Sequence, residues 1–138
     1  MRLTAEDARA LFAGQRVARL ATVRPDGRPH LVAICFACAG DTVYSAVDAK
    51  PKRTQELARL ANIAAEPRVA ILADHYEDDW ARLWWVRVDG RARIVDDPAE
   101  RTRALDLLAA RYRQYRDQPP EGPVLAVDAG RWSGWRFA

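Results

Sequence analysis

Hydrophobic and polar residues alternate with two different periods along this chain, and the periods predict which segments are helices and which are strands. Three segments carry apolar residues three or four positions apart, as one face of a helix requires. They start at Thr4, Thr54 and Asp97, residue types that favour helix N-termini. We expect helices to follow these residues, the first ending at Gly14 and the second near Ala65. The apolar face of the second helix is expected to consist of Leu57, Leu60, Ala61 and Ala64.

Other segments alternate with a period of two or are apolar throughout, as strands are. The first expected strand is Arg16–Val23, and Asp26-Gly27 after it is a strong hairpin signal. The return strand, His30–Cys38, is apolar on both faces, which is typical of a strand that is covered on both sides. With Thr42–Val47 these strands predict a three-stranded antiparallel meander.

The second half of the chain continues the strand pattern. Further strands are expected at Arg68–Asp74, Arg82–Val95, Val124–Asp128 and Arg131–Phe137. Asp89-Gly90 could close a hairpin, but we favour a bulge, because a strand of a small barrel must bend around its corner. About seven strands and three helices, with most strands adjacent in sequence, predict a mainly β (α+β) fold: an antiparallel barrel with peripheral helices.

Composition narrows the class of protein. The length predicts a single domain, 1–138, and 49% hydrophobic residues exclude wholesale disorder. The longest apolar run, near Leu31–Ala39, is shorter than the roughly 18 residues of a membrane span. The acids at Glu6 and Asp7 are unlike a signal peptide, so a cytoplasmic location is expected. Arginines are spread along the chain and the net charge is only +3, which argues against a nucleic-acid partner.

Two pairs of residues bear on possible sites. Cys35 and Cys38 form a C-x-x-C motif, but residues three apart on a strand point to opposite faces, so we expect inert thiols and no metal site. Trp84 and Trp85 must likewise face opposite sides of a strand. The outward tryptophan marks an interface or a ligand pocket, or else it lies under the helix that begins at Pro98.

The most distinctive polar stretch follows the strand Thr42–Val47. Lys50 and Lys52, the only lysines, stand with Arg53 directly before the helix that starts at Thr54. Clustered cations and the free N–H groups of a helix N-terminus together can hold a phosphate, although a solvated basic loop would have the same composition. No nucleophile elbow, P-loop or catalytic triad is found, which indicates that a bound cofactor carries the chemistry.

These motifs resemble those of a known family. The hairpin Ala18–Val32, the K-P-K-R-T loop and the segments Arg59–Asp74, Glu77–Ala92 and Arg131–Arg136 are similar, in this order, to the pyridoxamine-phosphate-oxidase-like split-barrel flavin-binding proteins. The combination of K-P-K-R-T with L-W-W-V-R-V-D-G-R-A resembles most the subgroup that uses coenzyme F420, a deazaflavin, in place of FMN. No counterpart of the C-terminal basic segment of the pyridoxamine phosphate oxidases proper is found, so oxidation of vitamin B6 is not expected.

The resemblance implies a split β-barrel homodimer with cofactor sites between the subunits. It implies that the cofactor phosphate is held by Lys50, Lys52, Arg53 and Thr54. Five residues are expected to place their backbone along the cofactor ring: His30, Val32, Ser45, Ala46 and Val47. The second subunit is expected to contribute the aromatic residues Trp80, Trp84, Trp85 and Trp135.

The function implied is an F420-dependent oxidoreductase that passes a hydride between the deazaflavin and a small organic substrate, which the sequence does not name. The cofactor ring itself performs the two-electron chemistry, so no side chain is expected to be catalytic. Two alternatives remain open: an FMN-binding oxidase or flavin reductase of the same fold, and a non-catalytic module that stores or senses a cofactor or haem. In the haem case His30 or His75 would be the iron ligand.

Overall fold

The computed structural model describes residues 1–47 and 53–138, with residues 53–57 described by their backbone alone. The helices are α1 (Ala5–Ala13), α2 (Arg53–Ala65), α3 (Pro98–Arg111) and α4 (Arg113–Asp117), with a 3₁₀ turn η1 (Trp80–Arg82). The strands are β1 (Ala18–Val23), β2 (Pro29–Ile34), β3 (Ala37–Ala39), β4 (Thr42–Ala46), β5 (Arg68–His75), β6 (Trp84–Ile94) and β7 (Val124–Arg136). None of the described helices is long and apolar enough to cross a membrane.

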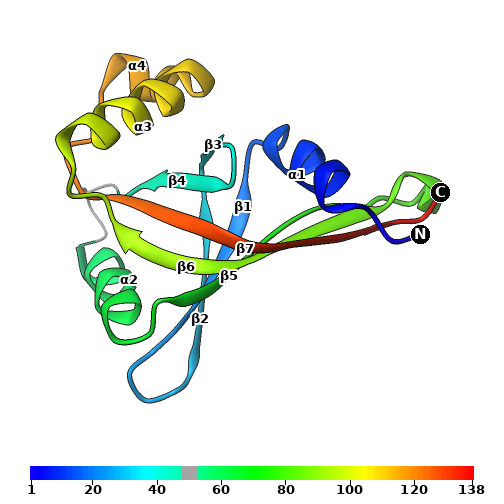
Figure 1. Ribbon diagram of the computed structural model, residues 1–138, viewed down its shortest axis with the longest axis horizontal. Helices are drawn as coiled ribbons and strands as arrows, with labels where there is room; N and C mark the ends of the chain where they lie inside the picture. The colour runs from blue at the N-terminus through cyan, green and yellow to red at the C-terminus, as the bar shows by residue number, and fades with distance from the viewer. Residues whose placement is uncertain (48–52) are drawn as a thin grey trace.

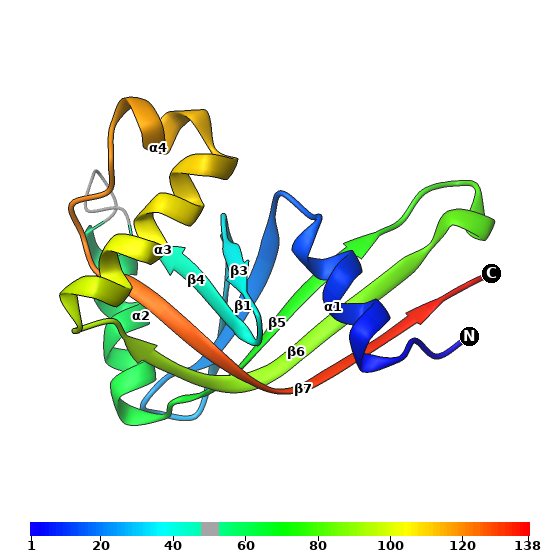
Figure 2. The ribbon, with the colours of Figure 1, turned by 45° about the horizontal axis from the view of Figure 1, so that its top comes forward.

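The strands form one antiparallel sheet that curls upon itself. Its order is β2-β1-β5-β6-β7-β4-β3 (Figures 1 and 2). Val32 and Ile34 of β2 belong to the same hydrophobic core as Val43 of β4, although the two strands lie near opposite edges of the sheet. An open flat sheet could not bring these side chains together, so the sheet is a half-barrel. The predicted antiparallel β-barrel with peripheral helices is confirmed.

The bend in the sheet occurs at a bulge between β6 and β7. Asp89 pairs with Arg131, whereas the next residue, Gly90, pairs with Ala129, so Gly130 is an extra residue in β7. A Cβ atom on Gly90 would lie only 2.5 Å from the Asp128 carbonyl oxygen, which explains why this position requires glycine. The predicted bulge is confirmed, and the two predicted C-terminal strands are one continuous strand.

The predicted meander is wrong. Segment 30–38 is not one strand: it breaks after Ile34, so that β2 and β3 lie at opposite edges of the sheet (Figure 2). At the break, the Phe36 N–H donates to the Tyr112 hydroxyl at 3.0 Å, and that hydroxyl donates to the Arg16 carbonyl at 2.7 Å. A side chain from α3's end therefore replaces the strand ladder at this point. Nor is β2 covered on both sides, because Leu31 is 66% exposed.

The starts of α1 and α3 follow the predicted caps, whereas α2 already begins at Arg53, one residue before the predicted start at Thr54. Thr4 Oγ1 accepts from the Asp7 N–H at 3.1 Å at the start of α1, and Asp97 caps α3. In α2 the predicted face is wrong in part, because Ala61 and Ala64 are exposed. Its buried residues are Asn62 and Ile63. The short helix α4 was not predicted.

Candidate functional site

One group of predicted site residues lies where β2 meets α2. His30 pairs with Thr22 across the β1–β2 hairpin, so both side chains face the concave side of the sheet. Asn62 of α2 donates to the Thr22 hydroxyl at 3.1 Å, and this buried hydrogen bond fixes α2 against β1 beside His30. Val32 is the next inward-facing residue of β2 and packs against the main core. Figure 1 shows α2 beside this hairpin, at one end of the molecule.

The histidine in this group is electrostatically unusual. Burial, and then the positive charges of Arg24 and Arg59, lower the pKa of His30 below its ordinary value. Its Nδ1 atom is buried and has no hydrogen-bond partner among the described residues. A neutral imidazole that stands beside two guanidinium groups is suited to an anionic or oxygen-rich ligand, which would satisfy the buried nitrogen and offset the positive charge.

The β4 residues of the predicted site are held rigidly. Ser45, Ala46 and Val47 are all buried, and the Val47 N–H donates to the Pro123 carbonyl at 2.8 Å. Ala46 packs in a small cluster with Leu108 of α3, whereas Val47 packs in the main core. Hydrogen bonding and packing therefore fix the position of the backbone at the end of β4.

The predicted phosphate-binding residues follow β4. Lys50 and Lys52 lie outside the described residues. Arg53 and Thr54 are the first two residues of α2, so the backbone there is a helix N-terminus, and their side chains lie outside the described part. The interpretation of these four residues as a phosphate site stays a prediction.

The predicted tryptophans form a second group. Trp84 is buried in the main core, whereas Trp85 is half-buried on the opposite face, so the prediction of opposite faces is confirmed. Trp85 pairs with Trp135 of β7. It lines a hollow with Leu72, Asp74, Tyr76 and Arg87 and with no residue of α3, so the alternative that the outward ring lies under the Pro98 helix is wrong.

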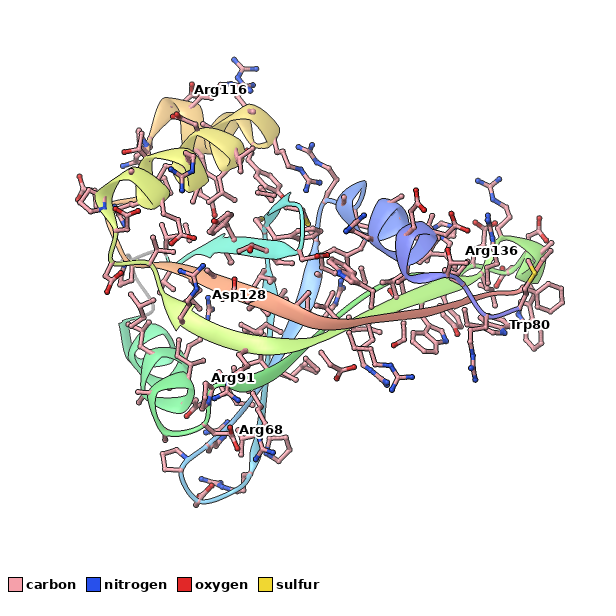
Figure 3. All side chains as sticks on the ribbon, in the orientation of Figure 1. Arg68, Trp80, Arg91, Arg116, Asp128 and Arg136 are labelled. Carbon is pink, nitrogen blue, oxygen red and sulfur yellow. The ribbon has the colours of Figure 1, made fainter. Side chains whose placement is uncertain are left out.

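One chain does not bring the two groups together. β6 and β7 extend beyond the barrel as a ribbon, and Trp80, which is 66% exposed, lies at its far end (Figure 3). Figure 1 shows α2 at the opposite end of the longest axis. A site that used His30 and Trp80 together would therefore need two chains.

The cysteines lack the features of a reactive or metal-binding pair. Cys35 lies in the break between β2 and β3 and not on a strand, and both thiols are free. Burial raises the pKa of Cys38 to about 11, so its thiol stays protonated at neutral pH. Within residues 1–47 and 58–138, no three acidic, histidine or cysteine side chains gather as metal ligands.

Sequence reasoning missed several residues of these two regions. Arg24 and Arg59 lie beside His30, and Leu72 and Arg87 lie beside Trp85. The position of Arg24 near His30 could have been predicted, because Arg24 directly follows the strand that carries Thr22, the residue opposite His30. The other contacts join segments that are far apart in sequence, and periodicity alone does not show them.

Comparison with known proteins agrees with this architecture. The sequence profile of the family described as Pyridoxamine 5'-phosphate oxidase matches residues 4–136. The chain therefore belongs to this family of split β-barrel proteins. No curated protein sequence gives a significant match.

Solved structures share the fold over almost the whole chain. A conserved hypothetical protein from Mycobacterium tuberculosis is 27% identical, with a TM-score of 0.77 over 97% of this chain and 84% of that one. A FAD-binding protein from Mesorhizobium loti is 22% identical, with a TM-score of 0.74 over 97% of this chain and 95% of that one. The haem storage protein HutZ from Vibrio cholerae is 17% identical, with a TM-score of 0.71 over 97% of this chain and 95% of that one.

Proposed function

We propose that this protein binds the deazaflavin coenzyme F420 and passes a hydride between it and a small organic molecule. The observation that carries the proposal is the buried, unpartnered Nδ1 of His30, whose ring faces the concave side of the sheet near the positive charges of Arg24 and Arg59. Such an arrangement fits a cofactor with several oxygen acceptors and negative charges. Membership of the pyridoxamine 5'-phosphate oxidase family supports the proposal that the protein binds a cofactor of this kind.

The residues of the chain have distinct tasks under this proposal. Lys50, Lys52 and Arg53 hold the cofactor phosphate, and the N–H groups at the start of α2, from Thr54 onward, add oriented donors. The β2 backbone from His30 to Val32 lies along the cofactor ring together with the end of β4 at Ser45, Ala46 and Val47. The bound deazaflavin supplies the two-electron chemistry. The protein orients the reactants and excludes water, so no side chain is assigned an acid–base role.

The second half of the site comes from a second copy of the chain in this proposal. Leu31 and Val23 are 66% and 36% exposed and lie on the sheet face that points away from the core. An exposed apolar area on one sheet face is typical of a protein interface. Packing two such faces together gives a homodimer in which the ribbon of one subunit, with Trp80, Trp85 and Trp135, reaches the cofactor held by the other, whereas Trp84 stays in the core of its own chain.

Calorimetric titration of the cofactor-free protein with coenzyme F420 and with FMN, side by side, tests the proposal. We expect saturable binding of F420, and a His30→Phe variant that binds it more weakly than wild type while a His75→Phe variant is unchanged. His75 is a matched control, because it is exposed and its ring already contacts Glu77. Tight binding of FMN without any response to F420 would overturn the choice of cofactor and favour the FMN alternative.

Haem forms a third arm of the same titration, because a non-catalytic storage or sensing role is the remaining alternative. Binding of haem that is lost in His30→Phe or His75→Phe, with no F420 binding, would replace the proposed oxidoreductase with that role. If F420 binds, turnover is then measured by loss of its absorbance with quinones, nitro-aromatic compounds and unsaturated ketones.

A further inference from the structure

A depression lies on the outer face of the sheet, around Trp85. Two adjoining hollows of about 420 and 370 Å³ share Trp85 and Arg87 as their common wall. The first continues over Leu72 and Tyr76, and the second continues along β7 to Trp135. Each is of the size that small-molecule sites have in proteins. Together they offer a continuous surface with Leu72, Tyr76 and the carboxylate of Asp74 at one end and the arginines of the second hollow at the other.

The polar end has an excess of positive charge. Arg2, Arg87 and Arg131 all line the second hollow. Arg87 is paired with Asp89, its Nε lying 3.1 Å from a carboxylate oxygen. In the part of the chain that the structure describes, Arg2 and Arg131 form no ion pair. Since no carboxylate lines this second hollow, two guanidinium groups remain available to a negatively charged ligand.

A buried hydroxyl lies between these guanidinium groups. Ser133 is two residues from Arg131 and two from Trp135 on β7, so the three share one face of the strand, and Arg87 is its partner across the sheet. Its Oγ atom is buried and has no hydrogen-bond partner among the described residues. A buried hydroxyl without a partner is costly, and a ligand oxygen at this position would satisfy it.

The walls of the depression are flat and aromatic. Trp85 and Trp135 are directly opposed on neighbouring strands and both are half-buried. The Arg87 guanidinium lies 5.8 Å from the centroid of the Trp85 ring, so one cation is already positioned over an aromatic face. Indole faces favour flat, conjugated ligands, and guanidinium forks favour planar carboxylates.

We propose that this depression binds a planar organic anion, whose ring lies against Trp85 and whose carboxylate is held by Arg131, Arg2 and the Ser133 hydroxyl. That this anion is the substrate of the enzyme rests on the proposed function. The binding site itself does not, because it is defined by residues of this face alone.

The test measures binding of 2-naphthoate and of its neutral analogue 2-naphthamide to the full chain without cofactor, by calorimetry. Naphthoate is expected to bind about tenfold more tightly than the amide, because it alone makes charge-assisted hydrogen bonds. Arg131→Gln should weaken naphthoate about tenfold and leave the amide within about twofold. Arg113→Gln, which removes the same charge from α4, is the matched control and should change neither. Trp85→Leu should weaken both probes.

Equal affinities for the two probes, or equal effects of Arg131→Gln and Arg113→Gln, would overturn the proposal. So would inorganic phosphate competing as effectively as naphthoate, since this would show a site for any anion. The circular dichroism spectrum and the thermal midpoint of each variant verify that it is folded. Because no cofactor is present in this experiment, its failure leaves the F420 titration unaffected, and the reverse also holds.

Discussion

Asn62 of α2 donates a hydrogen bond of 3.1 Å to Thr22 of β1, and both side chains are only 2% exposed. Ile63, the next residue of α2, packs in the main hydrophobic core beside this polar contact. The hydrogen bond sets the position of α2 next to His30, which pairs with Thr22 across the hairpin. The helix whose N-terminus is proposed to face the cofactor is therefore located by one buried pair of side chains.

Replacing Asn62 with Leu should destabilise the protein by about 1–3 kcal/mol, because the buried Thr22 hydroxyl would lose its partner. The double variant Asn62→Leu/Thr22→Val removes both polar groups and should recover a large part of this loss. Denaturant unfolding of the wild type, the two single variants and the double variant gives the coupling free energy. Strictly additive effects would show that the pair does not contribute as described.

The bulge gives a second prediction about stability. Gly90→Ala should cost about 1–3 kcal/mol, because the new methyl group would meet the Asp128 carbonyl oxygen and the Val127 side chain. Gly130→Ala is the matched control, since its Cβ would lie 3.5 Å from the Asp89 carbonyl oxygen, an ordinary contact. Urea unfolding should show Gly130→Ala within about 0.5 kcal/mol of wild type. If both variants lose equal stability, the close approach at Gly90 is not the cause.

Acid stability should depend on Glu100. Hydrogen bonds from Arg93 and then from Tyr44 lower the pKa of this carboxyl to about 2. The unfolded chain titrates near pH 4.3, so the stabilisation is complete above that pH and is lost as pH falls through about 2. The thermal midpoint of Glu100→Gln should start lower than that of wild type at pH 6 and should fall less between pH 5 and 2.5.

Glu121→Gln is the control for this experiment, because Glu121 lies in the loop before β7 and forms no ion pair with any side chain that the structure describes. Its midpoint should follow that of wild type at every pH. Parallel curves for wild type and Glu100→Gln would contradict the role of Glu100.

The cationic loop is tested with the variant Lys52→Ala/Arg53→Ala. Each charge-assisted hydrogen bond lost should weaken F420 binding by about 1.5–3 kcal/mol, and added salt should affect the variant less than wild type. The control variant Arg103→Ala/Arg113→Ala removes two exposed charges from α3 and α4 and should bind as wild type does. Unchanged affinity and unchanged salt dependence in Lys52→Ala/Arg53→Ala would refute the phosphate-binding interpretation.

The proposed dimer depends on the outer apolar face. Leu31→Asp places a carboxylate on that face and should raise the dimer dissociation constant by at least about tenfold, as measured by light scattering with size-exclusion chromatography. Ile94, which is 46% exposed near the α3 end of β6, provides the control variant Ile94→Asp. A wild-type protein that is monomeric at high concentration would exclude the two-chain site altogether.

Features set by neighbouring residues could be predicted from the sequence. The caps at Thr4 and Asp97 and the turn at Gly27 all depend on residues within a few positions of one another. The same is true of the opposite faces of Trp84 and its neighbour, because a strand alternates by geometry alone.

Features that depend on residues far apart in the sequence could not be predicted in this way. The strand 30–38 is apolar throughout, and it breaks because Tyr112, which lies 76 residues beyond Phe36, binds the backbone there. The buried face of α2 includes Asn62 because Thr22 provides a partner for it, which a count of apolar residues cannot reveal. The candidate sites combine strands from different parts of the sheet, so their membership follows from topology and not from spacing.

The break between β2 and β3 also has a consequence for how the protein is made. Strands β1, β2, β5 and β6 can assemble as one unit and β3 and β4 as another, and among the strands that the structure describes only β7 hydrogen-bonds to both units. Because β7 is the last strand to be synthesised, the two units cannot join into one sheet until the ribosome has released the end of the chain. Until then the unpaired margins of β6 and β4 are open to wrong partners, so this interval is when a nascent chain most needs a chaperone.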